Sequence, residues 1–583
     1  MKQFFKMFFA SLLALVVASL LSIWFFVSII TAMTTFASQS ESTNKLDDVT
    51  VLEIKLSGSL SDRSNSDEFD ELMNSLDKKS FSLTLENLRI ALDKAAASSQ
   101  VKCLYLKCGN LSASPAAIEE ARQLIAKFKE ETNLPIYAYA DNYNVNTYWI
   151  ATLADKIYLN NQGILDIHGC VASPMFYKRA LDKLGVKMQV FKVGTFKSAV
   201  EPYILTEMSE ANRLQLNRMV EGLWQSVEED IVNTRNISVD DLNKYANEGL
   251  FFADNNITVE MGLIDSLVYE QDVKEIIKNE FGKNADFVGV NYMSKVNVTS
   301  DFSANKIAVL YANGDIDGNS DSSMDSEEIV KELNKLAKND KVKAVVLRVN
   351  SPGGSAFGSE QMWYAAQQLK SKKPLIVSMG AYAASGGYYM SCMADTIVAE
   401  NTTLTGSIGI FGMMPDIQGL TDKLGLDVDI VKTHNYSDLG NIFRPMTQNE
   451  KNLMQNQVNR GYDLFVKRCA DGRGIPENRI REIAEGRVWL GKDALNLGLV
   501  DVIGGLDEAV EIAAEKADLD VYAVSSYPKK KTLVEMFTGD FINNVSLKML
   551  KNKLGGDAEL FNQYLYLKNM TGIQAIMPYK IEF

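Results

Sequence analysis

Two turns in the second half of the chain hold the residues best suited to nucleophilic chemistry. Each directly follows an apolar, β-branched run, and they span residues 350–355 and 379–388. Ser385 in the second turn precedes two glycines and a helical pattern that continues through Asp395. A serine at such a strand-to-helix corner presents its hydroxyl at the helix N-terminus, where free backbone N–H groups favour developing negative charge. Ser385 is therefore a candidate nucleophile.

The glycines beside these turns suit a site that stabilises an oxyanion. The backbone N–H of Gly386 and one from the turn holding Gly353 and Gly354 could together form an oxyanion hole. Glycine fits both places because the backbone must approach a substrate without a side chain between them. A Ser-Gly-Gly triplet alone is most often an ordinary turn, so the triplet by itself does not establish catalysis.

Composition restricts the other chemistries open to this chain. Its 583 residues carry a net charge of −14, which argues against nucleic acid as a partner because phosphate contacts need a basic surface. The chain has two histidines, His168 and His434, so a Ser-His-Asp triad or a multi-histidine metal site is disfavoured. The five cysteines are scattered and form no disulfide framework. We expect no metal and no cofactor.

The N-terminal segment predicts a membrane anchor. Residues 8–30 form an almost unbroken apolar run without charge, close to the ~20 residues that cross a bilayer. Lys2 and Lys6 precede it, which places the N-terminus in the cytoplasm and the rest of the chain on the extracytoplasmic side. A cleaved signal peptide has a shorter apolar region, and a buried core helix is the remaining alternative. We predict a single-pass, uncleaved anchor at 1–37 in a bacterial plasma membrane, followed by a polar linker at 38–47.

The body of the chain contains two related copies of one sequence pattern. Four segments recur in the same order at a separation of about 240 residues, which is the signature of an internal duplication. The pairs are 101–107 with 342–348, 153–155 with 393–395, 182–185 with 422–425, and 262–265 with 498–501. We predict a first repeat at 48–300, a second at 301–527, and a tail at 528–583 that either packs as an arm or touches the membrane or a neighbouring subunit.

Each repeat alternates strand and helix patterns. In the second repeat, residues 306–311, 344–349 and 375–379 have the short β-branched runs of strands. Residues 327–336 and 359–369 between them have helical patterns. This alternation predicts an α/β fold with parallel strands wherever a helix makes the crossover.

Four motifs resemble those of the signal peptide peptidase A, or protease IV, family. They are Ser-Pro-Gly-Gly-Ser at 351–355, Ala-Ala-Ser-Gly-Gly-Tyr at 383–388, Leu-Thr-Gly-Ser-Ile-Gly at 404–409, and the lysine segment 194–203. The resemblance is to the long, duplicated, membrane-anchored type. It implies two tandem crotonase/Clp-like domains, a serine-lysine endopeptidase, and a ring of four subunits. The implied substrates are signal peptides left after secretion and other unfolded polypeptides.

The resemblance implies Ser385 as nucleophile, Lys197 as general base and Ser407 as the residue that orients the lysine. The duplication tests this assignment from the sequence itself. Ser437 stands in the second repeat where the first has Lys197, and residues 145–147 of the first repeat contain no serine opposite Ser385. The first half lacks the serine and the second half lacks the lysine, which predicts one composite site per chain. An ordinary solvated lysine and a purely structural Ser407 are the alternatives.

Lys197 can act as a base only when it is neutral. Its usual pKa of ~10.4 must fall by about 3, which corresponds to roughly 4 kcal/mol. Burial against apolar surface at the junction of the two repeats would produce this change, because desolvation disfavours the ammonium form.

Two other functions share parts of this pattern. A crotonase-type acyl-CoA enzyme would use the same fold and oxyanion logic, but a serine-lysine pair has no evident role in it. A proteolytically silent membrane scaffold would retain the fold alone. Covalent labelling of Ser385 by an acylating inhibitor separates the peptidase from both.

Overall fold

The computed structural model describes most of the two predicted repeats. The described residues are 45–64, 83–297, 303–318, 323–530 and 573–576, with Lys6, Val17, Trp24 and Ser28 as isolated positions. Apart from those four isolated positions, the predicted anchor at 1–37 lies outside the described residues, as does most of the predicted tail at 528–583. Among the described residues, no helix combines the length and apolar character needed to cross a membrane.

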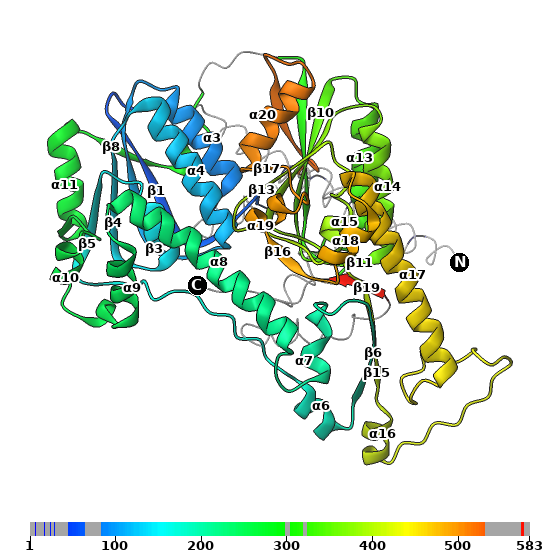
Figure 1. Ribbon diagram of the computed structural model, residues 1–583. Helices are drawn as coiled ribbons and strands as arrows, with labels where there is room; N and C mark the ends of the chain where they lie inside the picture. The colour runs from blue at the N-terminus through cyan, green and yellow to red at the C-terminus, as the bar shows by residue number, and fades with distance from the viewer. Residues whose placement is uncertain are drawn as a thin grey trace.

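The first half of the chain forms a seven-stranded sheet of parallel pairs in the order β2-β1-β3-β4-β5-β7, with β8 also paired to β1 (Figure 1). Its strands are β1 (Thr50–Ser61), β2 (Leu83–Thr84), β3 (Val101–Ser112), β4 (Ile136–Tyr143), β5 (Lys156–Leu165), β7 (Ser266–Leu267) and β8 (Asp286–Gly289). The helices of this half are α3 (Leu85–Ala96), α4 (Pro115–Thr132), α5 (Val145–Ala151), α6 (Lys178–Leu184), η1 (Ser198–Val200), α7 (Glu201–Ile204), α8 (Glu210–Arg235), α9 (Val239–Asn247), η2 (Leu250–Phe252), α10 (Asn256–Glu260), α11 (Glu270–Phe281) and α12 (Val290–Met293).

The second half forms an eight-stranded sheet in the order β16-β14-β12-β10-β9-β18, with β13 paired to β12 and β17. Its strands are β9 (Lys306–Asn313), β10 (Val342–Ser351), β12 (Leu375–Ala384), β13 (Thr396–Ala399), β14 (Leu404–Gly406), β16 (Val488–Leu490), β17 (Val502–Ile503) and β18 (Ala523–Tyr527). Its helices are α13 (Ser326–Lys338), α14 (Ala356–Lys370), α15 (Gly386–Tyr389), α16 (Gln418–Leu424), α17 (Gln448–Arg473), α18 (Glu477–Ile483), α19 (Gly491–Asn496) and α20 (Leu506–Lys516). Only β14 and β16 pair antiparallel in this sheet among the described residues. The predicted α/β alternation with parallel strands is confirmed.

The duplication is visible in repeated hydrogen bonds. The Tyr148 hydroxyl donates to the Leu263 carbonyl at 2.7 Å, and the Tyr388 hydroxyl donates to the Leu499 carbonyl at 2.9 Å. In the same way, Arg235 at the end of α8 and Arg473 at the end of α17 each donate to a glycine carbonyl about 25 residues further on. The two halves therefore share side-chain contacts as well as strand order.

A buried ion-pair cluster joins the two halves. Arg348 of β10 is 1% exposed, and its guanidinium lies 2.6 Å from Asp62 and 2.5 Å from Glu120, both from the first half. Burial of a charge is tolerated where it is paired and hydrogen-bonded, so this cluster holds the halves in one relative position.

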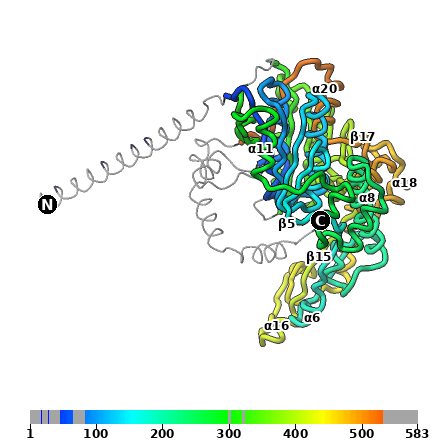
Figure 2. The backbone as a smooth tube through the Cα atoms, turned by 90° about the vertical axis from the view of Figure 1, so that its left-hand side faces the viewer, coloured from blue at the N-terminus to red at the C-terminus, as the bar shows by residue number. Residues whose placement is uncertain are grey.

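A third, four-stranded sheet crosses the boundary between the halves in the order β11-β19-β15-β6. Its strands are β6 (Lys187–Lys192), β11 (Gly353–Ser355), β15 (Phe411–Asp416) and β19 (Ile573–Ile576). β6 and β15 pair antiparallel over six residues each. Helix α6 precedes β6 and helix α16 follows β15, and together they form an arm projecting from the body (Figure 2). This arm brings the first-half segment that follows β6 into the second half.

Candidate active site

Ser385 stands at the end of β12 in a strained conformation. Its φ of 54° and ψ of −112° are rarely adopted by a residue with a side chain, and its side chain is fully buried. Its backbone N–H donates to the Gly406 carbonyl at 2.8 Å, which holds the corner against β14. The sequence predicted a helix from here through Asp395, and this is wrong: α15 ends at Tyr389, and turns follow it. The corner is held by backbone contacts with β14 and not by a long helix.

Lys197 lies between β6 and η1 and points into the second half. It is 1% exposed, and its Nζ is 2.8 Å from the Oγ of Ser385, 3.0 Å from the Oγ of Ser407 and 3.2 Å from the Ser407 carbonyl. Burial lowers the pKa of Lys197 from 10.5 to about 7. A substantial fraction of this amine is therefore neutral near pH 7.

Ser407 follows β14 and is 1% exposed. Its φ is 49°, and its backbone N–H donates to the Arg487 carbonyl at 2.7 Å. The hydroxyl of Ser385 also reaches the Gly409 carbonyl at 3.4 Å. The structure thus brings together the three polar side chains that the sequence singled out, two from the second half and one from the first.

The glycine turn lies directly against the Ser385 corner. A Cβ on Gly387 would stand 2.7 Å from the Ser351 carbonyl, so only glycine allows this approach. Gly354 has a φ of 153°, and a Cβ there would stand 2.3 Å from the Ile316 carbonyl. The N–H of Gly353 donates to the Oγ of Ser351 at 3.2 Å. Gly386 begins α15 directly after Ser385, beside this turn.

The first half has no equivalent group in its described residues. Its strand-to-helix corner is closed by Asn144, whose side chain forms a capping box with Thr147, and no serine lies in that corner. Ser437, the counterpart of Lys197, is exposed and bonded to Thr433 and His434. The counterpart of Ser407 is His168, which is exposed and lies 2.5 Å from Asp166.

The sequence did not foresee the strand β19. Ile573–Ile576 pairs antiparallel with β11 on one side and with β15 on the other. Its β-branched residues are a weak strand signal, but four residues give no indication of their partners. This part of the predicted tail therefore packs against the glycine turn that contains Gly353 and Gly354.

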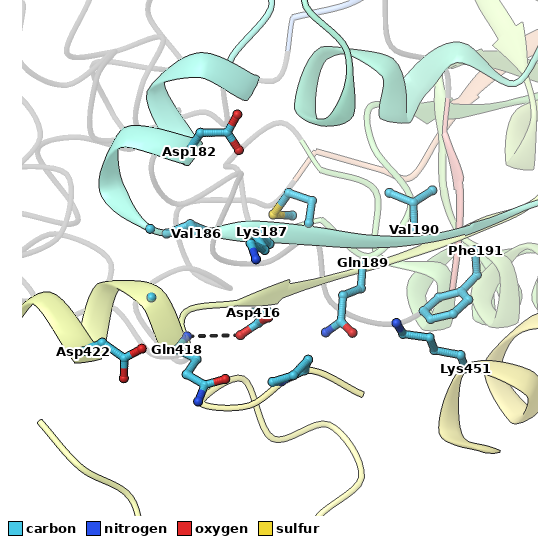
Figure 3. Close-up of a pocket in the computed structure, with 14 residues that line it drawn as sticks. Asp182, Val186, Lys187, Gln189, Val190, Phe191, Asp416, Gln418, Asp422 and Lys451 are labelled. Atoms are coloured by element: carbon cyan, nitrogen blue, oxygen red, sulfur yellow. Dashed lines mark hydrogen bonds between the residues drawn. The ribbon is translucent and has the colours of Figure 1, made fainter. Parts of the chain in front are cut away.

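A large cavity lies on the projecting arm that α6, β6, β15 and α16 form. It measures about 760 Å³ and lies between β6, β15 and α16 (Figure 3). Its lining includes Gln189, Phe191, Asp416 and Lys451, and it contains none of Ser385, Lys197 and Ser407. No group of three or more histidine, cysteine or acidic residues suited to a metal ion occurs in the part of the chain that the structure describes.

Comparisons with known proteins define the family. The sequence profile of peptidase family S49 matches residues 128–283 and 367–520, once in each half of the chain. The chain is 34% identical to "Protease 4" of Haemophilus influenzae over 562 residues, covering 92% of this chain and 89% of that protein. It is 35% identical to "Protease 4" of Salmonella typhi, covering 71% of this chain and 69% of that protein. It is also 29% identical to the chloroplastic "Serine protease SPPA" of Arabidopsis thaliana, over 78% of this chain and 68% of that protein.

The chain belongs to peptidase family S49 and is a serine-type peptidase with a tandem duplication of the family domain. Among solved structures, it is similar to a mutant of ClpP1 from Listeria monocytogenes, with 13% identity, 35% of this chain and 94% of that chain covered, and a TM-score of 0.24.

Proposed function

We propose that the peptidase works through a serine-lysine pair, with Ser385 as nucleophile, Lys197 as general base and Ser407 as the residue that orients the lysine. The observation that carries this proposal is the 2.8 Å contact between the Lys197 Nζ and the Ser385 Oγ, with both side chains buried. Each half of the chain contributes one of these two groups, in agreement with their complementary loss from the repeats.

The chemistry follows from the neutral amine. Lys197 accepts the Ser385 proton as Oγ bonds to the peptide carbonyl carbon, and the carbonyl oxygen becomes an oxyanion. As the carbon–nitrogen bond breaks, the lysine returns that proton to the departing amine and leaves an acyl-enzyme. The neutral lysine then deprotonates a water that attacks the ester, and Ser385 regains its proton when the acid leaves. Ser407, whose Oγ lies 3.0 Å from Nζ, orients the amine toward Ser385.

Backbone donors from two turns are the proposed oxyanion hole. The proposed donors are the N–H of Gly386 and one from Gly353 and Gly354; in the structure the N–H of Gly353 is bonded to Ser351, and Gly354 pairs with Ala575 of β19. The contact between Gly387 and the Ser351 carbonyl keeps the two turns at a fixed spacing. A pre-positioned donor pair of this kind contributes about 3–4 kcal/mol per donor to transition-state stability.

Substrates bind in this proposal as extended strands between β11 and β15. The support is that β19 already occupies this position, antiparallel to both neighbours. Phe411 pairs with Gln574, and Gly409, two residues before Phe411, contacts Ser385. The C-terminal end of a strand bound in this register therefore lies nearest the nucleophile, so the groove holds the acyl side of the substrate.

We further propose that the substrates are residual signal peptides and other unfolded polypeptides. A relative named "Putative signal peptide peptidase SppA" from Enterococcus faecium is 32% identical over 282 residues, 47% of this chain and 81% of that protein. The proposal includes the anchor at 1–37, an extracytoplasmic catalytic part at a bacterial plasma membrane, a crotonase/Clp-like fold in each repeat and a homotetramer. No cofactor or nucleic acid enters it.

The test compares the full-length protein with Ser385→Ala and Lys197→Ala on a peptide ester and an unfolded protein. Ser437→Ala is the matched control, because it is the exposed counterpart of the lysine. We expect cleavage by wild type and control only, and an acyl adduct on Ser385 with a serine-directed inhibitor. Full activity in Lys197→Ala would overturn the base assignment. A folded but inert wild type would favour the scaffold, and thioester turnover would favour an acyl-CoA enzyme.

A further inference from the structure

The backbone on both sides of Lys197 is held by residues that neither the motifs nor the proposed chemistry uses. We propose that Gln215 and the turn at Glu485 and Gly486 form a clasp that positions Lys197 against Ser385. This inference rests on the proposed function, because it concerns the placement of the general base. The clasp residues act through the lysine and are positioning residues.

Gln215 of α8 reaches both neighbours of the lysine. It is 1% exposed, and its Nε2 donates to the Phe196 carbonyl at 3.2 Å and to the Ser198 Oγ at 2.8 Å. Its Oε1 accepts the backbone N–H of Val488 at 3.3 Å. One buried amide thus ties the residues before and after Lys197 to β16 of the other half.

β16 also pairs with β14, the strand that leads to Ser407. Val488 pairs with Gly406 of β14, and the Arg487 carbonyl accepts the N–H of Ser407 at 2.7 Å. Gln215 therefore connects the lysine backbone, through two consecutive residues, to the serine that bonds the lysine amine. A displacement of this amide would therefore shift both the lysine backbone and Ser407.

The turn before β16 supports the lysine from the other side. The N–H of Phe196 donates to the Glu485 carbonyl at 3.0 Å, and the N–H of Gly486 donates to the Ile408 carbonyl at 2.9 Å. Gly486 has a φ of 76°, and a Cβ there would stand 2.6 Å from the Lys197 Cβ and 2.8 Å from its Cα. The two backbones can approach this closely only because residue 486 is glycine.

The first repeat has a corresponding turn, but no lysine lies against its glycine. Glu248 and Gly249 correspond to Glu485 and Gly486, and Gly249 has a φ of 68° with no atom within 4 Å of the position of a Cβ. At the place of Gln215, six residues after the N-cap, α17 has Leu453, which is 45% exposed. Gln215 comes from the first half and Glu485 and Gly486 from the second, so the clasp surrounds the retained lysine, and their counterparts Leu453 and Gly249 serve as internal controls.

The paired glycines give a matched experiment. Gly486→Ala and Gly249→Ala each add one Cβ to a glycine with positive φ, so their backbone strain is similar, but only the first meets Lys197. Relief of a 2.6 Å contact needs a shift of about 1 Å, which lowers a positioned reaction about 10²-fold. We expect kcat to fall by about that factor in Gly486→Ala with KM unchanged, and to stay near wild type in Gly249→Ala.

A second pair of variants tests the amide. Gln215→Met keeps the length of the side chain and removes its hydrogen bonds, whereas Gln225→Met makes the same change at an exposed site of α8. We expect about a tenfold fall in kcat and in the rate of Ser385 acylation for Gln215→Met, and no change for Gln225→Met. Both clasp variants must keep a thermal midpoint that shows folded protein at the assay temperature.

The outcomes separate the clasp from the function on which it rests. If Gly486→Ala and Gln215→Met keep wild-type kcat while Lys197→Ala and Ser385→Ala are inert, the clasp is overturned and the serine-lysine pair stands. A rise in KM with unchanged kcat would also overturn it, because a mispositioned base affects the acylation step and not peptide binding. If Lys197→Ala is fully active, the proposed function itself fails.

Discussion

Replacing Lys197 by methionine is expected to abolish activity and to make the folded protein more stable. Burial lowers the pKa of this lysine from 10.5 to about 7. Each tenfold change in proton affinity corresponds to about 1.4 kcal/mol, so keeping the lysine in the fold costs about 5 kcal/mol at pH 7. Methionine has a similar length, fills the site without a charge, and removes this cost.

The net gain is smaller, because the variant also loses the contacts of Nζ with Ser385 and Ser407. At about 1 kcal/mol for each hydrogen bond, we expect Lys197→Met to be stabilised by about 3 kcal/mol at pH 7. Natural active sites commonly sacrifice stability for function in this way.

The sign of the pH dependence follows from the two states of the lysine. Below pH 7 the folded and unfolded states both hold the proton, and the cost of burial is constant. Between pH 7 and 10.5 the unfolded state binds more protons, so the wild-type free energy of unfolding rises with pH by about 1.4 kcal/mol per unit relative to the variant. The advantage of Lys197→Met therefore shrinks as the pH increases.

Urea unfolding of both full-length proteins at pH 7, 8 and 9 measures this difference. Lys331→Met, on the exposed face of α13, is the control and should stay within about 0.5 kcal/mol of wild type at each pH. A destabilised Lys197→Met, or a difference from wild type that is constant between pH 7 and 9, would refute the argument that burial alone keeps this lysine neutral.

Four further outcomes follow from the same structure. The value of kcat/KM should rise with pH to a plateau, with a midpoint at about 7 set by the lowered pKa of Lys197; a midpoint near 10 would contradict this assignment. Ser407→Ala should lower kcat about tenfold, because the lysine amine loses one of its hydrogen bonds, and steady-state kinetics at saturating peptide ester measures this. Arg348→Met should lower the free energy of unfolding by about 3–5 kcal/mol in urea titrations, because it leaves two buried carboxylates without their partner. Truncation after residue 572 should raise the rate at which an acylating inhibitor labels Ser385, because β19 no longer fills the groove between β11 and β15; an unchanged rate would mean that the strand does not compete with substrates.

Much of the fold was predictable because its signals are local. The runs at 306–311, 344–349 and 375–379 are strands in the structure, each extended by a few residues, because alternating β-branched and helical segments specify parallel α/β units without reference to distant residues. The helix expected after Ser385 was the error. Its apolar residues do lie in the core, but turns bury them as well as a helix would.

The sequence by itself determined the candidate chemistry of this protein. The complementary loss of Lys197 from one repeat and of Ser385 from the other was readable from the duplication alone, and so was the prediction of one composite site. Tertiary structure decided how far the lysine is desolvated, which strand lies between β11 and β15, and which backbone segments contact the lysine. Gly249 and Gly486 have the same local sequence signal and a similar φ, yet one faces open space and the other touches Lys197. Contacts between segments hundreds of residues apart are set by packing of the whole chain, and no local pattern specifies them.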